Sequence, residues 1–268
     1  MSVTTGDDRA VGMCPASLLV EPMAARPDEV RAAGEAAVAA GCTTASAWTD
    51  HVPALTGLGL HLEVIEAAVQ WATGTPDEAR AEADRFASVA QSVGASLVVA
   101  VAFGPGLDDV GRARDNLAPL VDAVAAVGAR VCVEFVPGSA IPDMATAWDL
   151  VAPLGNQAGL LVDTWHWTRQ RGGPNPELLA TIPGDRVCYV QVGDVAPEPE
   201  DDVFAEMMQH RLLPGDGVVD FRAFFDGLGA IGAAPFFATE IFNPGMVREL
   251  GVAQAARAMV EAARRVLA

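Results

Sequence analysis

Short aliphatic segments alternate with amphipathic helical segments along nearly the whole chain of 268 residues. This alternation requires parallel strands joined by right-handed helical crossovers. Eight such units close most simply into a barrel, so the predicted fold class is α/β, a (β/α)8 TIM barrel. We expect a single domain over residues 11–268, preceded by a flexible N-terminal tail over residues 1–10. The strands are expected at 11–19, 42–48, 58–65, 97–103, 131–135, 159–163, 187–194 and 236–242.

The second strand-helix unit is expected to be abbreviated. Only residues 49–57 separate the second strand from the third, which leaves no room for a full helix. The third segment is also the least distinct, because Leu62, Ile65 and Val69 fit a helical period as well as a strand. The longest departure from the alternation follows the seventh strand, at residues 195–217, and loops of this length commonly form lids or binding elements.

The charged residues exclude several classes of function. The formal net charge is −18, which argues against nucleic acid or an anionic membrane surface as a partner. All 17 basic residues are arginines and no lysine occurs. Schiff-base aldolase chemistry, lysine-anchored pyridoxal phosphate and a P-loop lysine are therefore excluded.

Cysteine usage and the first residues favour a cytoplasmic protein. The four cysteines stand singly, without CxxC or CxxH spacing, so we expect buried reduced thiols and no zinc-thiolate site. Residues 1–10 lack the charged and apolar regions of a signal peptide, and no apolar run is long enough to span a membrane. Association into a homo-oligomer stays open.

Polar side chains end the last four predicted strands. Aliphatic runs lead into Glu134, into Asp163 with His166 three residues later, into Gln191, and into Glu240. The C-terminal ends of barrel strands meet on one face, where active sites lie. Carboxylate and amide oxygens suit Mg²⁺, Mn²⁺ or a similar ion, so the sequence predicts one divalent metal held by these four strand-end groups.

These motifs resemble the xylose isomerase-like TIM barrels, also described as sugar phosphate isomerases/epimerases. Members carry a Glu after strand five, Asp-x-x-His after strand six, usually a His after strand seven, and a Glu after strand eight. The segment Arg211-x-x-Pro214-Gly215-Asp216-Gly217 also matches the family's Arg and Gly-rich turn. The resemblance covers nearly the whole chain from about Val11 and is densest over residues 131–242.

The resemblance implies a set of roles for individual residues. Glu134, Asp163, Gln191 and Glu240 would ligate a metal, with Mn²⁺ or Mg²⁺ favoured and Co²⁺ as an option. Either glutamate could move a carbon-bound proton, and His166 would touch substrate oxygens. The residues expected to bind substrate are Arg211 at an anionic or polar end, His51, Trp165 and Asp194. Alternatives to these substrate contacts remain for both histidines. His166 could be a core histidine packed between two tryptophans, and His51 could lie in an exposed loop.

Two positions depart from specialised branches of this family. Gln191 stands where most relatives have His, and a Gln at this position resembles the dehydroshikimate dehydratases. Against that branch, no arginine ends the third or fourth strand, where it could hold a substrate carboxylate. Ala140 stands six residues after Glu134, where ketose 3-epimerases carry a second Glu.

Three functional hypotheses therefore remain. The first is a divalent-metal-dependent isomerase or epimerase of a carbohydrate-like or cyclic polyol substrate, acting by proton abstraction next to a metal-bound carbonyl. The second is a dehydratase or lyase on the same scaffold. The third is a barrel that binds a metal or small molecule without turnover.

Overall fold

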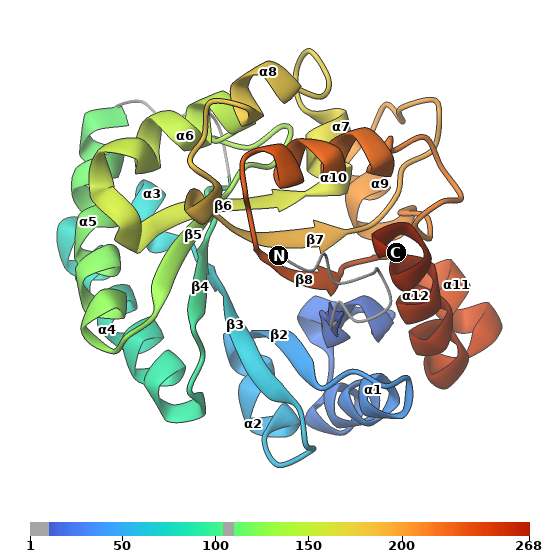
Figure 1. The fold of residues 1–268 in the computed structure, drawn as a ribbon. Coiled ribbons are helices and arrows are strands. Elements are labelled where there is room, and N and C mark those ends of the chain that lie inside the picture. The colour runs from blue at the N-terminus through green and yellow to red at the C-terminus, as the bar shows by residue number, and fades with distance from the viewer. Residues whose placement is uncertain (1–10, 104–109) are drawn as a thin grey trace, which may run out of the picture.

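The chain folds into a closed barrel of eight parallel strands that pair in the order of the sequence (Figure 1). The computed structural model describes residues 11–103 and 110–268. Helices surround the barrel and connect its strands. The predicted (β/α)8 TIM barrel is therefore confirmed.

The elements lie within one or a few residues of the expected segments for most of the chain. The strands are β1 (Gly12–Met13), β2 (Thr44–Trp48), β3 (His61–Ala68), β4 (Leu97–Ala100), β5 (Arg130–Glu134), β6 (Ala158–Asp163), β7 (Val187–Val192) and β8 (Phe236–Thr239). The α-helices are α1 (Pro27–Ala39), α2 (Val52–Leu55), α3 (Gln70–Thr73), α4 (Pro76–Val93), α5 (Val110–Ala126), α6 (Met144–Val151), α7 (Thr164–Arg169), α8 (Pro176–Leu179), α9 (Val203–Gln209), α10 (Phe221–Ala230), α11 (Pro244–Leu250) and α12 (Val252–Leu267). Short 3-10 turns cover Pro15–Leu18, Pro22–Ala24, Thr49–His51, Ala152–Gln157 and Gly184–Arg186.

Strands β6 and β7 are buried on both faces, and β5 to β8 lie side by side in the barrel. Every residue of β6 and β7 is buried, which explains their continuous aliphatic sequences. Asp163 pairs with Gln191 in the β6–β7 register, and Glu134 pairs with Leu161 in the β5–β6 register. This register delivers the polar strand-end residues to one edge of the barrel.

Local signals explain where α4 begins and ends. Thr75 and Glu78 form a reciprocal capping box before Pro76, which satisfies backbone donors at the helix start. Gly94 ends the helix with φ of 71°, a left-handed conformation that glycine adopts without a Cβ penalty.

Among the strand ends that differ from the sequence-based expectation, those of β1 and β3 matter most for the site. The first strand covers only Gly12–Met13, because Pro15 begins a 3-10 turn and removes a backbone donor from the ladder. The third strand continues to Ala68 instead of ending at Ile65. The second unit is abbreviated as expected, with a 3-10 turn and the four-residue α2 in place of a full helix.

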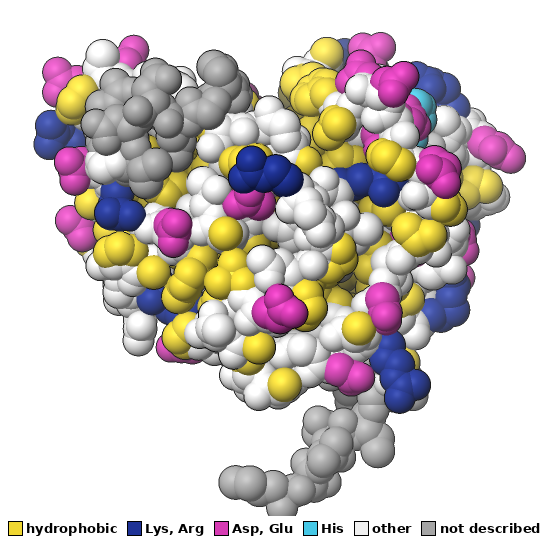
Figure 2. Space-filling view, turned by 90° about the horizontal axis from the view of Figure 1, so that it is seen from above, with side chains coloured by type: hydrophobic (Ala, Val, Ile, Leu, Met, Phe, Trp, Pro, Cys, Tyr) yellow, Lys and Arg dark blue, Asp and Glu magenta, His cyan; other side chains and the backbone are white. Residues whose placement is uncertain are grey.

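Contacts between the two ends of the chain complete the barrel. Strand β1 pairs with β8, and the backbone N–H of Cys14 donates to the carbonyl of Thr239 at 2.9 Å. The N–H of Ile241 donates to Oγ of Ser17 at 3.0 Å, and α12 packs against α1. On the face seen in Figure 2, arginines stand at scattered positions among acidic and apolar side chains. None of the described helices is both long and apolar enough for a bilayer crossing.

Candidate metal centre and substrate cavity

The four predicted ligand side chains converge at the C-terminal edge of β5 to β8. Glu134 ends β5, Asp163 ends β6, Gln191 lies in β7 and Glu240 directly follows β8. Ligand atoms of Glu134, Asp163 and His166 all lie within 4.8 Å of one another. Nε2 of Gln191 donates to Oε1 of Glu240 at 2.8 Å. The structure therefore places Glu134 and Asp163 in one cluster with His166, and Glu240 in a second cluster with Glu66 and Cys14, while Gln191 is bonded to Glu240.

Asp163 connects the barrel to the start of α7. Its Oδ1 accepts the backbone N–H groups of Trp165 at 2.6 Å and His166 at 3.3 Å, which caps the helix. This cap orients His166, whose Nε2 lies 3.1 Å from Oε1 of Glu134. His166 lines the cavity and also contacts Trp165 edge-on, so it is a buried histidine that belongs to the site.

Arg211 is buried among the carboxylates. Its Nη1 lies 2.6 Å from Oδ2 of Asp163 and 3.4 Å from Oε2 of Glu240, and its Nε donates to the carbonyl of Met207 at 2.8 Å. Burial lowers the pKa of Arg211, but the charges of Asp163 and Glu240 outweigh it and raise the pKa overall. The guanidinium is therefore charged and already paired, although it also borders the cavity.

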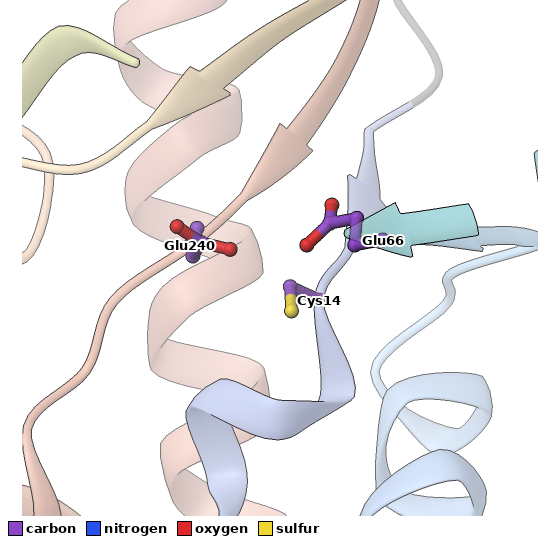
Figure 3. A group of neighbouring side chains, drawn as sticks. All are labelled: Cys14, Glu66 and Glu240. Carbon is purple, nitrogen blue, oxygen red and sulfur yellow. The ribbon is translucent and has the colours of Figure 1, made fainter. Parts of the chain in front are cut away.

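Glu66 belongs to the site and was missed in the sequence. It projects from β3 toward Glu240, with Cys14 beside both (Figure 3). Its Oε1 accepts from Nε2 of Gln191 at 3.3 Å and from the hydroxyl of Tyr189 at 3.4 Å. The expected strand ended at Ile65, one residue earlier. A signal was present, because Glu66 stands two residues after Val64 and therefore shares its face of the strand, which is buried.

The buried carboxylates raise one another's pKa values. Burial, followed by the charge of Glu134, raises the pKa of Glu66 to about 8. Burial and the charge of Glu66 raise the pKa of Glu240 well above its usual range, although Arg211 opposes this shift. Burial, Glu66 and Glu240 also raise the pKa of the Cys14 thiol. The site holds more carboxyl groups than Arg211 could neutralise if all of them were ionised.

The residues present fit a divalent cation. Oε1 of Gln191 is buried and has no hydrogen-bond partner among the described residues, whereas its Nε2 is engaged by Glu240 and Glu66. Under this amide orientation, the free atom is the one that can ligate a metal. Three carboxylates and an amide oxygen form a hard donor set, and a divalent cation would offset the repulsion between these carboxylates when they are ionised.

A cavity of about 1330 Å³ opens beside these residues. Its walls come from loops that follow the strands, as in other barrels of this architecture. Residues 201–208, which include most of α9, form one wall, so the long segment after β7 contributes to the cavity as expected of a binding element. His51 also borders the cavity and stacks on Trp48 with ring centroids 5.2 Å apart, while burial lowers its pKa.

Two residues expected to bind substrate lie elsewhere. Trp165 is fully buried, contacts Arg211 from behind at 5.6 Å and does not border the cavity. Asp194 is also buried, and its carboxylate accepts the backbone N–H groups of Gly215, Gly217 and Val219. Its role is to hold the turn after β7, because a loop with that many inward N–H groups requires a buried acceptor.

A family model described as the xylose isomerase-like TIM barrel matches residues 18–265. The chain belongs to this family. The match covers nearly all of the barrel and includes the strands that end in Glu134, Asp163, Gln191 and Glu240.

One curated enzyme matches part of the chain. A curated 3-dehydroshikimate dehydratase from Pseudomonas putida is 33% identical over 87 residues, which span 32% of this chain and 13% of that relative. The chain therefore matches only a small part of that protein's length.

Solved structures of this family share the fold at low identity. An IolI protein with a bound zinc atom is 18% identical, with a TM-score of 0.80 over 96% of this chain and 98% of that one. A D-allulose 3-epimerase from Methylomonas sp., solved with D-allulose, is 17% identical, with a TM-score of 0.73 over 99% of each chain. Identities this low show the fold alone.

Proposed function

We propose that this xylose isomerase-like barrel is a divalent-metal-dependent isomerase or epimerase of a small polyhydroxylated carbonyl compound. The observation that carries the proposal is the placement of Glu134, Asp163, Gln191 and Glu240 at the ends of neighbouring strands, where Glu134 and Glu240 line the cavity and Oε1 of Gln191 has no partner among the described residues. Family members with epimerase names and the zinc-containing IolI structure support it.

The proposed reaction is proton transfer next to a carbonyl. A bound divalent ion would polarise the substrate carbonyl and stabilise negative charge on its oxygen. A carboxylate oxygen then removes the proton from the neighbouring carbon, and the electron pair of the broken C–H bond moves toward the carbonyl oxygen. Return of a proton to the other face or to the neighbouring carbon gives the epimer or the isomer.

Glu134 is the better placed of the two glutamates for this transfer. Both carboxylate oxygens of Glu240 are engaged, one by Gln191 and the other by Arg211. Glu134 contacts His166 through Oε1, and its side chain is 13% exposed on the cavity. His166 would hold the carboxylate in position and present a polar edge to the substrate oxygens, and Arg211 would steady Asp163.

A dehydratase or lyase is the second candidate. Gln191 at the position where most relatives carry His, together with the local match to a 3-dehydroshikimate dehydratase, favours it. In that reaction the same carboxylate removes the proton, but the electron pair then expels a β-hydroxyl group as water. Deuterium incorporation from solvent without loss of water supports the isomerase, whereas a new enone absorbance supports the lyase.

The first test is the metal content of the protein purified without chelator. We expect about one Mn, Mg, Co or Fe per chain in the wild type, and loss of most of it in Asp163→Ala, because a carboxylate ligand is removed. Asp122→Ala, an exposed acid on α5, is the matched control and should keep the metal. A metal-free wild type whose melting temperature does not rise with Mn²⁺ would overturn the metal-dependent mechanism.

The second step is a substrate screen with the metal found. With a substrate in hand, Glu134→Gln should lower kcat by at least about 100-fold, since a positioned base contributes that much or more. A protein that binds metal but keeps full turnover in both Glu134→Gln and Glu240→Gln would contradict the proton-transfer roles.

A further inference from the structure

The charges around the cavity disfavour an anionic substrate. Acidic residues line it in depth and at its mouth; they are Asp50, Glu66, Glu134, Asp201, Asp202 and Glu240. Among the described residues, Arg211 is the one arginine of the lining. Its guanidinium is already held by Asp163 and Glu240. Neither a phosphate nor a carboxylate would meet an unpaired cation from these side chains, and either would be repelled by the acids.

The outer wall of the cavity is largely apolar. Val69, Val101 and Val136 follow β3, β4 and β5, while Met207 and Phe204 approach from α9 and Phe242 follows β8. Phe103 and Phe204 are 53% and 55% exposed although both border the cavity. Large apolar side chains left exposed at a concave site indicate an apolar ligand surface that covers them.

The volume of the cavity also favours a substrate with an additional apolar part. Its volume of about 1330 Å³ exceeds the range of roughly 300–1,000 Å³ typical of small-molecule sites. A small sugar at the carboxylates would leave the space near Phe103 and Phe204 unfilled.

We propose that the substrate is an uncharged hydroxy-carbonyl compound whose polar head reaches the carboxylates and whose apolar body, aromatic or alkyl, lies along this wall. The inference rests on the proposed function, because that function places the carbonyl head at the metal site. Sugar phosphates and carboxylate-bearing substrates are excluded from this class.

Three hydroxamates test the proposal, because each presents the same metal-chelating head. Benzohydroxamate adds an aromatic body, acetohydroxamate adds only a methyl group, and phosphoglycolohydroxamate adds an anion. In calorimetry with the metal-loaded protein, we expect benzohydroxamate to bind at least about tenfold more tightly than either of the others, since a phenyl group is buried without a charge. Equal affinities, or tightest binding of the phosphate compound, would overturn the proposal.

Variants of residues in the apolar wall test whether the aromatic part of benzohydroxamate binds there. Phe204→Ser should weaken benzohydroxamate severalfold and leave acetohydroxamate unchanged, whereas Val218→Ser, an exposed apolar position outside the cavity, should change neither. Asp201→Asn should strengthen phosphoglycolohydroxamate relative to the neutral probes, and Asp122→Asn should not. Identical effects of Phe204→Ser and Val218→Ser would contradict an apolar body at this wall.

A metal-independent comparison separates this inference from the proposed function. Saturation-transfer NMR on the metal-free protein compares 2-hydroxyacetophenone with dihydroxyacetone phosphate, two α-hydroxyketones of opposite character. If the protein binds no metal but prefers the aromatic ketone, the metal-dependent mechanism is wrong and the proposed substrate class is supported. If the protein binds metal but prefers the phosphate, the substrate class is wrong and the metal-dependent mechanism is supported.

Discussion

Hydrogen bonds from Gln191 to two carboxylates fix the orientation of its side-chain amide. The amide of Gln191 is held through Nε2 by two carboxylates, from Glu66 and Glu240, so its Oε1 is the atom left over. Replacing Glu66 would remove one of the two acceptors that fix this amide. Glu66 therefore positions a candidate metal ligand, and it comes from a strand whose end was not predicted correctly from the sequence.

The pKa of Glu66 leads to a prediction for the metal-free protein. Burial raises that pKa to about 8 from 4.5, so between these pH values the folded chain binds more protons than the unfolded chain. The contribution of this proton to stability is complete below about pH 4.5 and is lost as the pH rises through about 8. We expect the melting temperature of the chelator-treated protein to fall across this window.

Glu66→Gln should reduce that fall, because the amide does not titrate. Melting temperatures of the wild type and the variant at about pH 5 and about pH 8 measure it. Glu261→Gln, an exposed glutamate on α12, is the control and should follow the wild type. An unchanged pH dependence in Glu66→Gln would show that this carboxyl does not titrate in the window.

At the scale of elements, α9 forms a cavity wall because an ion pair joins it to α7. Nε of Arg169 donates to Oε1 of Glu206 at 2.8 Å, and Nη2 donates to the carbonyl of Ala196 at 2.7 Å. The side chain of Glu206 is 2% exposed, and its Oε2 accepts the N–H of Glu200 at 3.0 Å. One buried carboxylate thus ties the helix and its preceding loop to the barrel.

Breaking this pair should be strongly destabilising. Arg169→Met leaves Glu206 buried without its cation, and we expect a loss of about 3–5 kcal/mol in the free energy of unfolding, measured by urea denaturation. The double variant Arg169→Met with Glu206→Leu should recover most of that loss, since no buried charge remains. A single variant as stable as the wild type would show that the pair does not hold α9.

At the scale of the whole molecule, the barrel is closed by very few residues of its first strand. Strand β1 has two residues, and the chain then turns into a 3-10 segment whose Ser17 accepts the N–H of Ile241. That bond joins positions near the two ends of the chain and lies next to Glu240. Closure of the barrel and placement of a candidate ligand therefore depend on the same contact.

Ser17→Ala should weaken the closure without changing the fold. The variant leaves the buried N–H of Ile241 without its acceptor, which costs about 1–3 kcal/mol, and unfolding should stay a single transition. Ser92→Ala removes an exposed hydroxyl on α4 and should change the free energy of unfolding by less than about 0.5 kcal/mol. Equal losses in the two variants would contradict a special role for Ser17.

Much of this molecule could be predicted from the chain alone, because strands buried on both faces are continuous aliphatic runs and polar residues that end them stand out. The eight-unit barrel, the shortened second unit and the positions of Glu134, Asp163, Gln191 and Glu240 at strand ends follow from that pattern. Boundaries were less accurate: Pro15 ended the first strand early, and the third strand ran on to include Glu66.

What only the tertiary structure decided is which side chains pair across the barrel. Trp165 and Asp194 stand next to site residues in the sequence, yet one packs behind Arg211 and the other holds a turn. Arg211 was expected to bind an anionic or polar end of a substrate; the structure places it at the cavity and pairs it with Asp163 and Glu240. The physical reason is that sequence periodicity specifies which face of a strand is buried, whereas the partner of a buried charge is set by contacts between residues far apart in the chain.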